Sequence, residues 1–242
     1  MPHPEDEATS VATPDRTAPA ASDLGADLRA RMRRLPALAG DLPELDPDAL
    51  PLDPVAAFLG WFAEAVEAGV PEPQAVTVAT ADAAGRPSSR VVVLKDVDDE
   101  GRWVFATDRR SRKARDLAVN PAVALSFYWQ PLGRQVRITG TAVALDAQAC
   151  AADFLARSPA SRAAAFATRP GEPLPDIPTL HAALRTALAD VHAAPDAVLA
   201  DWVVHAVVPE EVELWQGAGT RAHQRVVYRR AGGGWSRELV WP

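Results

Sequence analysis

Short apolar runs separated by turn residues dominate the chain from residue 75 onward. In residues 75–81 and 122–129, β-branched and aromatic side chains alternate with small or polar ones, as they do in half-buried strands. The same pattern predicts strands at 89–96, 103–107, 134–145, 202–208, 212–215, 225–230 and 236–240. Turn residues separate these runs, and 231–234 (Ala-Gly-Gly-Gly) is typical of a hairpin loop. The pattern predicts a mainly β fold, an antiparallel barrel.

Helical spacing of apolar residues predicts accessory helices around these strands. Asp53-Pro54 is typical of a helix start, with Asp as N-cap and Pro in the first turn, and Gly69 marks the end. The predicted buried face of this helix consists of Val55, Phe58, Leu59, Phe62 and Val66. Further helices are predicted at 28–35, at 111–119 with Ser111 as cap, at 146–157 with Asp146 as cap, and at 179–191, whereas 158–173 is expected to be irregular.

The first 50 residues differ from the rest of the chain. Residues 1–25 hold four prolines and few bulky apolar side chains, so we expect disorder there. Residues 28–35 carry four arginines, which a solvated helix face explains, and 36–51 is expected to be a connector. The predicted organisation is a disordered or irregular N-terminal segment, 1–50, followed by one domain, 51–242.

Charge and cysteine content exclude several classes of protein. The net charge is −7, but residues 1–53 hold 11 acids and 5 arginines, which leaves 21 acids and 20 bases in the rest. A nearly neutral domain argues against binding of nucleic acid, which requires a basic surface. No apolar run approaches the roughly 18 residues that cross a bilayer, and the single Cys150 cannot form a disulfide within the chain. We expect a cytoplasmic protein with neither a nucleic-acid nor a membrane partner.

Basic residues suggest a phosphate site. Only two of the 25 basic residues are lysines, Lys95 and Lys113, and a compact ammonium suits a phosphate monoester. Ser111-Arg112-Lys113 opens a predicted helix, where free backbone N–H groups already favour an anion. Each basic group alone is also explained as solvated charge, but together, in a neutral domain, they predict a bound phosphorylated molecule.

Two other features fit a planar ligand. Arg221, His223 and Arg225 occupy alternate positions, which places them on one side of an extended segment. Trp215 just before them either packs in the core or walls a planar ring, and Gln135 offers an amide to a heterocycle. The remaining histidines lack the spacing of metal ligands, so no metal site is predicted, and Cys150 is expected in the core.

Six motifs in order resemble the pyridoxamine 5′-phosphate oxidase family. They are Arg90-Val-Val-Val-Leu-Lys95, Ser111-Arg112-Lys113, Asn120-Pro121, Phe127-Tyr128-Trp129, Arg134-Gln135-Val136, and Trp215-Gln216-Gly217 with Arg221-x-His223-x-Arg225. The resemblance runs from about residue 53 to residue 242. It implies an FMN-binding split β-barrel of antiparallel Greek-key type, and a homodimer with FMN at the interface.

The resemblance also assigns roles to residues. It implies FMN contacts from Arg90, Val91, Lys95, Thr107, Arg112, Lys113, Gln135, Trp215 and Arg225. It places Lys95, Arg157, Ser161, Arg221 and His223 at the substrate, with Arg221 and His223 as catalytic residues. The implied reaction oxidises pyridoxine or pyridoxamine 5′-phosphate to pyridoxal 5′-phosphate, with hydride transfer to flavin N5 and reduction of O2 to hydrogen peroxide.

Departures from the family pattern concentrate on the substrate side. Asp153 stands where the family has a Tyr, Pro159 is one position late, and Arg169-Pro170 replaces a Gln-Ser pair that reaches the flavin. Near Arg33 and Arg34, Pro36 occupies the position of the Tyr in an N-terminal lid. The substrate therefore stays open. The alternatives are a flavin oxidase of the same fold acting on a secondary metabolite, as in phenazine pathways, and a non-catalytic carrier of flavin or B6 phosphate.

Overall fold

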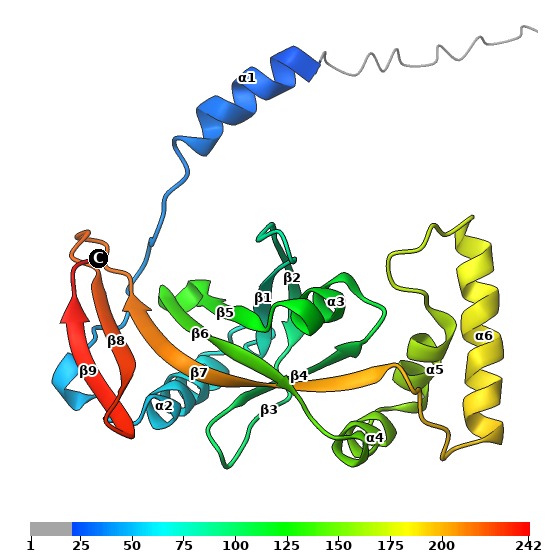
Figure 1. Ribbon diagram of the computed structural model, residues 1–242. Helices are drawn as coiled ribbons and strands as arrows, with labels where there is room; N and C mark the ends of the chain where they lie inside the picture. The colour runs from blue at the N-terminus through cyan, green and yellow to red at the C-terminus, as the bar shows by residue number, and fades with distance from the viewer. Residues whose placement is uncertain (1–20) are drawn as a thin grey trace, which may run out of the picture. The chain divides into compact units, whose positions relative to one another are not determined.

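The computed structural model describes residues 21–242, which fall into two units divided after Ala39 (Figure 1). In the first unit, Ala21–Met32 forms helix α1. The helix expected at 28–35 therefore begins earlier, at Ala21, within the segment for which disorder was expected. This run of Ala, Leu and Arg is rich in strong helix formers, which explains the early start. The expectation for residues 1–20 lies outside the described residues.

The second unit is built on one antiparallel sheet of nine strands, which confirms the predicted mainly β fold with accessory helices. The main path runs β2-β1-β5-β6-β7-β4-β3, and β8 and β9 extend from β7. The strands are β1 Ala75–Ala81, β2 Pro87–Val93, β3 Asp96–Val97, β4 Trp103–Asp108, β5 Ala122–Trp129, β6 Arg134–Ala144, β7 Trp202–Gln216, β8 Gln224–Ala231 and β9 Gly234–Val240. Strands β2 and β3 lie at the two ends of this path and do not pair with each other, so the barrel is open.

Strand β7 connects the two ends of the sheet. It is one strand of 15 residues where two strands, 202–208 and 212–215, were predicted. Strand β6 pairs with β7 on both sides of Pro209, and the register of this pairing shifts between Thr139 and Gly140. The proline therefore does not end β7. On its other side, β7 pairs with β4 along its first half and with β8 along its second half. Figure 1 shows this long strand joining the β8–β9 hairpin at one end to the helices at the other.

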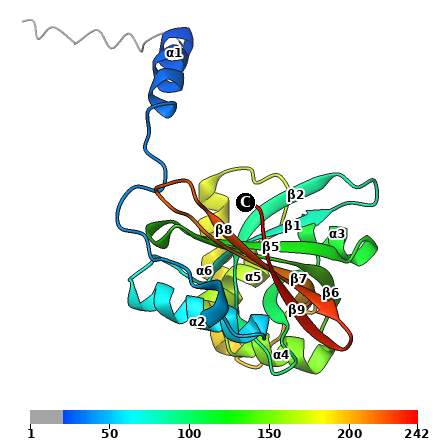
Figure 2. The same cartoon turned by 90° about the vertical axis from the view of Figure 1, so that its left-hand side faces the viewer.

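Helix α2 (Pro54–Glu67) closes one side of the core, beneath the strands in Figures 1 and 2. The side chain of Asp53 caps it, accepting a hydrogen bond from the Val55 amide at 3.1 Å. The buried face was predicted only in part. Phe58 is buried, but Leu59 and Val66 are 48% and 54% exposed, and Trp61 lies in the core in their place. The stripe that faces the sheet consists of Pro54, Ala57, Phe58, Trp61 and Ala65.

Four more α-helices follow α2 in the second unit. Helix α3 (Arg112–Val119) begins at the predicted cap Ser111, and α4 (Ala147–Leu155) begins at Asp146 and buries Cys150 as expected. A helix α5 (Pro159–Ala167) occupies part of the segment expected to be irregular. The start of α5 is specified by adjacent residues, because Ser158 caps the helix and Pro159 occupies its first turn. Helix α6 (Ile177–Ala193) packs beside α5.

Candidate functional site

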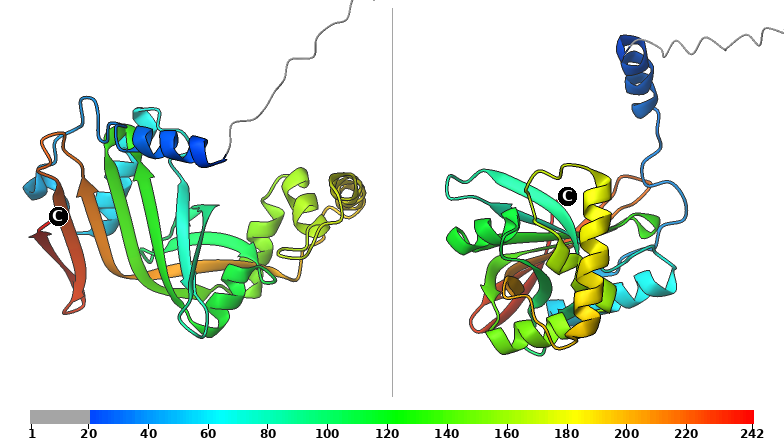
Figure 3. Two further views of the ribbon diagram at one scale, coloured as in Figure 1. Left: turned by 90° about the horizontal axis from the view of Figure 1, so that it is seen from above. Right: turned by 90° about the vertical axis from the view of Figure 1, so that its right-hand side faces the viewer.

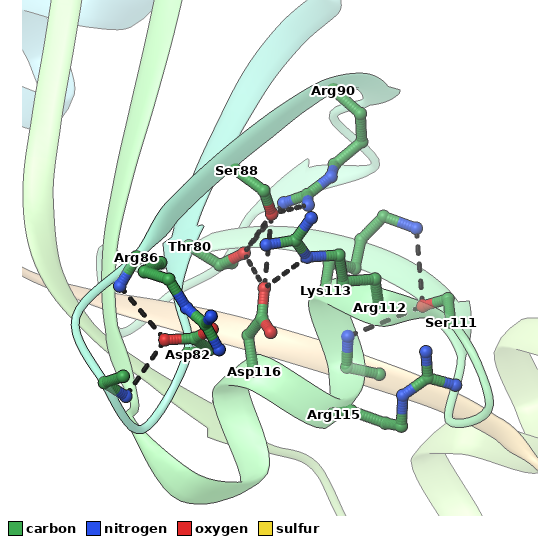
Figure 4. Close-up of polar contacts among 12 residues, drawn as sticks. Thr80, Asp82, Arg86, Ser88, Arg90, Ser111, Arg112, Lys113, Arg115 and Asp116 are labelled. Atoms are coloured by element: carbon green, nitrogen blue, oxygen red, sulfur yellow. Dashed lines mark hydrogen bonds and ion pairs between the residues drawn. The ribbon is translucent and has the colours of Figure 1, made fainter. Parts of the chain in front are cut away.

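A group of cations surrounds the start of α3 (Figure 4). We call Arg90, Arg112 and Lys113 the α3 cluster. Lys113 Nζ donates hydrogen bonds to Thr107 Oγ1 at 2.9 Å and to Ser111 Oγ at 3.5 Å. Both hydroxyl residues are buried, one at the end of β4 and the other at the helix cap. Strand β4 and the cap of α3 therefore fix the ammonium of Lys113 beside the free amides of the first helical turn.

Arg90 reaches the same place from β2. Its Nη1 donates to Thr80 Oγ1 at 2.9 Å, and its Nη2 contacts Ser88 Oγ. Asp116, buried on α3, accepts from Thr80 Oγ1 at 2.7 Å and from Ser88 Oγ at 3.3 Å. This chain of polar contacts holds the guanidinium of Arg90 near α3 without a direct ion pair (Figure 4).

The α3 cluster carries more positive than negative charge. Asp116 is 3.9 Å from Arg112 Nε, whereas no carboxylate in residues 21–242 forms an ion pair with Lys113. Burial and the nearby charge of Arg90 lower the pKa of Lys113, and Asp108 acts in the opposite direction. Burial also lowers the pKa of Arg90, with Asp116 opposing the shift. A bound anion would relieve this repulsion, so the cluster is suited to bind a phosphate group.

A second group lies on neighbouring strands at the far end of β7. Gln135 pairs with Trp215, and Trp215 pairs with Arg225, so β6, β7 and β8 present the three residues side by side. Arg225 is fixed by buried Glu213, whose Oε2 accepts from its Nε at 3.2 Å, and by the carbonyl of Trp241 at 3.1 Å.

Arg221 and His223 lie next to this second group. Arg221 has a φ of 67° and belongs to a turn, and the extended strand begins only at Gln224. The prediction that Arg221, His223 and Arg225 share one side of an extended segment is therefore wrong. The ring of His223 lies 5.1 Å from that of Trp215, and its Nδ1 accepts the Ala218 N–H at 3.1 Å. A cavity of about 420 Å³ separates this turn from the C-terminal residues 239–242.

The third group contains Lys95, Arg157 and Ser161. Lys95 lies after β2, which ends at Val93, whereas the strand was predicted to continue to residue 96. The alternation of side chains along a strand therefore does not determine on which side Lys95 lies relative to Arg90. Its ammonium forms an ion pair with Asp153 of α4. Arg157 stacks on Trp202 with its Cζ 4.1 Å from the ring centroid. Ser161 Oγ accepts from the cap Ser158 Oγ at 2.9 Å.

The described fold separates the first and third groups from the second. Thr107 pairs with Val203, and Gln135 pairs with Trp215, twelve residues further along β7. At about 3.3 Å per residue the strand covers roughly 40 Å between them. Figures 1 and 3 show the same separation, with the β8–β9 hairpin and helices α5 and α6 at opposite ends. A ligand of flavin size cannot contact both ends of one chain, so the residues expected at FMN do not form a single site within one chain.

Two remaining sequence expectations concern exposed positions. Val91 lies on edge strand β2 with its side chain 66% exposed, on the face opposite Arg90. Arg169 lines a cavity of about 460 Å³ between the end of α5 and the start of α6, and pairs with Glu172 at 3.8 Å. Among residues 21–242, no hydrogen bond or ion pair links Arg169 to the α3 cluster.

Sequence reasoning missed Thr80, Ser88, Asp116 and Glu213. Thr80 and Ser88 look like ordinary strand residues, and Asp116 looks like an exposed helix residue. Glu213 alternates with apolar neighbours in a strand, and this was the available signal, because a carboxylate on the buried face of a strand requires a cation.

His205 on β7 is a buried histidine outside these groups. It is 7% exposed, both ring nitrogens lack a hydrogen-bond partner among residues 21–242, and its ring lies 5.4 Å from that of Phe105. Burial, with the charges of Arg109 and Lys113, lowers its pKa from 6.5 to about 4. The unfolded chain therefore binds more protons than the folded chain between these two values, and stability falls as the pH is lowered through that window.

We expect the free energy of unfolding to fall by about 3 kcal/mol between pH 7 and pH 4 because of His205 alone. Urea unfolding of wild type and His205→Leu at several pH values measures this, and the variant should lose that part of the pH dependence. Replacing exposed His181 of α6 by leucine is the control and should leave the slope unchanged. An identical slope in wild type and His205→Leu would contradict the assignment.

Neither a membrane span nor a metal site is found in the described residues. In residues 21–242 no helix has the length and hydropathy that crossing a bilayer requires. The same residues contain no group of three or more His, Cys, Asp or Glu side chains placed to hold a metal ion.

Comparison with known proteins agrees with this geometry. The family described as pyridoxamine 5′-phosphate oxidase matches residues 62–193, and the C-terminal dimerisation region of pyridoxine 5′-phosphate oxidase matches residues 202–242. A pyridoxine/pyridoxamine 5′-phosphate oxidase of Thermosynechococcus vestitus is 40% identical over 218 residues, which cover 90% of this chain and 98% of the relative.

Two solved structures share the fold. The crystal structure of PhzG from Burkholderia lata, in complex with tetrahydrophenazine-1-carboxylic acid, has a TM-score of 0.76 and 31% identity, covering 84% of this chain and all of PhzG. An FMN-binding protein of Nostoc punctiforme, related to pyridoxamine 5′-phosphate oxidase, has a TM-score of 0.64 and 22% identity over 76% of this chain and 96% of its own. This chain therefore belongs to the pyridoxamine 5′-phosphate oxidase family, and it is a flavoprotein oxidoreductase with the split-barrel fold.

Proposed function

We propose that this protein is an FMN-dependent oxidase that converts pyridoxine or pyridoxamine 5′-phosphate to pyridoxal 5′-phosphate. The observation that carries the proposal is the α3 cluster. There a half-buried lysine and two arginines meet at a helix start with one carboxylate to balance them. Such an excess of positive charge is destabilising unless an anion is bound. The 40% identity to an oxidase of this name extends over 90% of the chain and supports the same activity.

The proposed active unit is a homodimer with FMN at the interface. The dimerisation region matched at residues 202–242 contains Trp215, Arg221, His223 and Arg225. In a two-fold dimer, this end of one chain meets the α3 cluster of the other, and the same contact occurs twice. Such an arrangement brings together residues that a single chain holds about 40 Å apart along β7.

In the proposed complex the residues divide by task. The α3 cluster and Thr107 hold the phosphate of FMN, whereas Gln135, Trp215 and Arg225 contact the flavin from the partner chain. When bound, FMN supplies a hydride acceptor at N5 and transfers the electrons to O2, which yields hydrogen peroxide. The protein orients the substrate on the flavin.

Arg221 and His223 would position the substrate over the flavin. His223 accepts the Ala218 N–H at Nδ1, so in the neutral ring Nε2 carries the proton and can donate to a substrate oxygen. Arg221 lines the cavity of about 420 Å³ beside it. Lys95, Arg157 and Ser161 of the other chain would hold the anionic group of the substrate.

A steady-state assay tests the proposal. FMN-loaded protein should consume O2 and release hydrogen peroxide with pyridoxine 5′-phosphate and with pyridoxamine 5′-phosphate. Turnover of neither compound, together with oxidation of another planar heterocycle, would reject the B6 substrate. Flavin that stays oxidised with every substrate tested would instead favour a non-catalytic carrier.

Arg221→Ala should lower kcat/KM by about 100-fold with FMN still bound, because a charged contact to the substrate is lost. Alanine keeps the Cβ, so the positive φ at this position is equally strained in the variant. Steady-state kinetics and the ratio of flavin to protein measure the two effects separately. Arg229→Ala, on the neighbouring strand and paired with Glu211 at 2.9 Å, is the control and should change neither. Loss of flavin from Arg221→Ala would show that this arginine serves the cofactor.

One observation favours a second candidate, a flavin oxidase of the same fold that acts on a secondary metabolite. Asp153 forms an ion pair with Lys95 and so removes one cation from the proposed phosphate site. The ligand of PhzG, a structural neighbour at 31% identity, carries a carboxylate and not a phosphate. A substrate of this kind needs less positive charge.

A further inference from the structure

The side chains of Lys95, Asp153, Arg157 and Trp202 form a cluster at the start of β7. Lys95 pairs with one oxygen of Asp153, and the other oxygen, Oδ2, accepts a hydrogen bond from Trp202 Nε1 at 2.8 Å. The guanidinium of Arg157 lies flat against the same indole ring, 4.1 Å from its centroid. These contacts join the end of β2, helix α4 and the start of β7, so none of the four side chains is free to reorient alone.

Arg157 has an unused donor in this cluster. Its Nη1 is buried and has no hydrogen-bond partner within residues 21–242. Burial lowers the pKa of Arg157, and the charge of Asp153 acts in the opposite direction. A buried guanidinium nitrogen without an acceptor is costly in free energy. A ligand that places an oxygen within hydrogen-bond distance of it would remove this cost.

Asp153 sets the charge that such a ligand meets. With Lys95 and Arg157 as the cations and Asp153 as the acid, the cluster carries one net positive charge. A carboxylate has one negative charge, whereas a phosphate monoester has about 1.5 to 2 at neutral pH. A phosphate bound between Lys95 and Arg157 would approach the carboxylate of Asp153 and repel it.

Asp153 cannot easily move away from an incoming phosphate. Turning it outward breaks the ion pair with Lys95 and the hydrogen bond from Trp202 together. Loss of the second bond leaves an indole N–H unpaired next to the ring on which Arg157 stacks. The carboxylate is therefore part of the site whenever Arg157 is in place.

We propose that Asp153 is a specificity-determining residue, which lowers the net charge of the anion site of Lys95 and Arg157 to +1 and so weakens the binding of a phosphate dianion more than the binding of a carboxylate. The inference rests on the proposed function only in that this site holds the anionic group of the substrate. Within the proposed function, Asp153 would make B6 phosphates bind more weakly than they would at the same site without this carboxylate.

Asp153→Asn tests the inference by direct binding to the FMN-loaded protein. Asparagine keeps an acceptor for Trp202 Nε1 and removes the charge. Titrations followed by flavin absorbance would use pyridoxal 5′-phosphate and phenazine-1-carboxylate. We expect Asp153→Asn to bind pyridoxal 5′-phosphate about tenfold more tightly and to change binding of the carboxylate less than threefold, with the difference shrinking at high salt. Asp190→Asn, an exposed acid of α6, makes the same charge change and should alter neither affinity.

A second variant keeps the test decisive if Asp153→Asn does not fold. Lys95→Met removes the cation and leaves Asp153 in place, so pyridoxal 5′-phosphate should bind at least tenfold more weakly than to wild type. Unchanged phosphate affinity in both variants, or an equal gain for both ligands in Asp153→Asn, would overturn the inference.

Turnover is measured separately, because it decides the proposed function and not this inference. Tighter phosphate binding by Asp153→Asn without oxidation of any B6 phosphate would support the role of Asp153 and reject the proposed function. Turnover of B6 phosphates by wild type, with no gain in affinity in the variant, would do the reverse.

Discussion

Replacing Gly140 with alanine is expected to lower the free energy of unfolding by about 3 kcal/mol or more, which is large for one methyl group. A Cβ at this position would lie 2.0 Å from the carbonyl oxygen of Val208 and 3.0 Å from Pro209 Cα. Both are backbone atoms, so no side-chain rotation relieves the clash. Gly140 pairs with Pro209 of β7 at the register shift between the two strands. Strand β7 connects the two ends of the sheet, so a distortion at this position would affect both.

Thermal and urea unfolding of wild type and Gly140→Ala measure this effect. For a domain of this size, 3 kcal/mol corresponds to a fall in Tm of roughly 6–12 °C. Gly60→Ala is the matched control, because Gly60 lies on the exposed side of α2 and a Cβ there meets nothing within 4 Å. The control should be stabilised slightly, by about 0.5–1 kcal/mol. Equal stability of Gly140→Ala and wild type would show that the strands separate easily at this crossing.

The second large effect is expected at the α3 cluster. Lys113→Ala should weaken FMN binding by about 30–100-fold, since a charge-assisted hydrogen bond to phosphate contributes roughly 2–3 kcal/mol. The ammonium of Lys113 is bonded to Thr107 and Ser111 at a helix start, where an anion is already favoured. Burial and the charge of Arg90 lower the pKa of Lys113, so this lysine loses its proton at a lower pH than an ordinary lysine. The affinity of the wild type for FMN should therefore begin to decline at a lower pH as the solution is made alkaline.

The ratio of flavin to protein after purification, and titration of the apoprotein with FMN, measure the loss. Lys113→Met keeps most of the aliphatic stem and separates the loss of charge from the loss of packing. Arg115→Ala is the matched control, because it removes one cation from the same helix, and the guanidinium of Arg115 contacts the carbonyl of Arg110 and not the cluster. A Lys113→Ala protein that retains its full complement of FMN would contradict the proposed phosphate site.

Local signals predicted most of the elements correctly. Strands β1 and β5 and the starts of α2, α3 and α4 agree with the sequence prediction, because alternation and capping residues act within a few positions. The prediction failed at α5, where Ser158-Pro159 was overlooked as a helix start, and at β7, which was predicted as two strands on either side of Pro209. Pro209 stays within the strand because β6 shifts register opposite it, and only the pairing of distant residues can show this.

The exposed apolar residues of α2 show the same limit. Leu59 and Val66 have helical spacing relative to Val55 and Phe62, so the sequence allowed a face that included them. Packing selected the neighbouring stripe, in which Phe58 meets Trp103 and Phe127. A helix with apolar residues on more than one side does not specify its buried face by periodicity alone.

The sequence by itself determined most of the elements, the family, and the residues expected at the flavin, because strand alternation, helix caps and short motifs are local properties. The tertiary structure alone decided how those residues group. It paired Asp153 with Lys95, fixed Arg225 through Glu213, and placed Trp215 of β7, with Arg225 beside it on β8, far from Lys113. Each of these relations joins residues that are distant in the chain. They depend on strand register and packing, which no local pattern encodes.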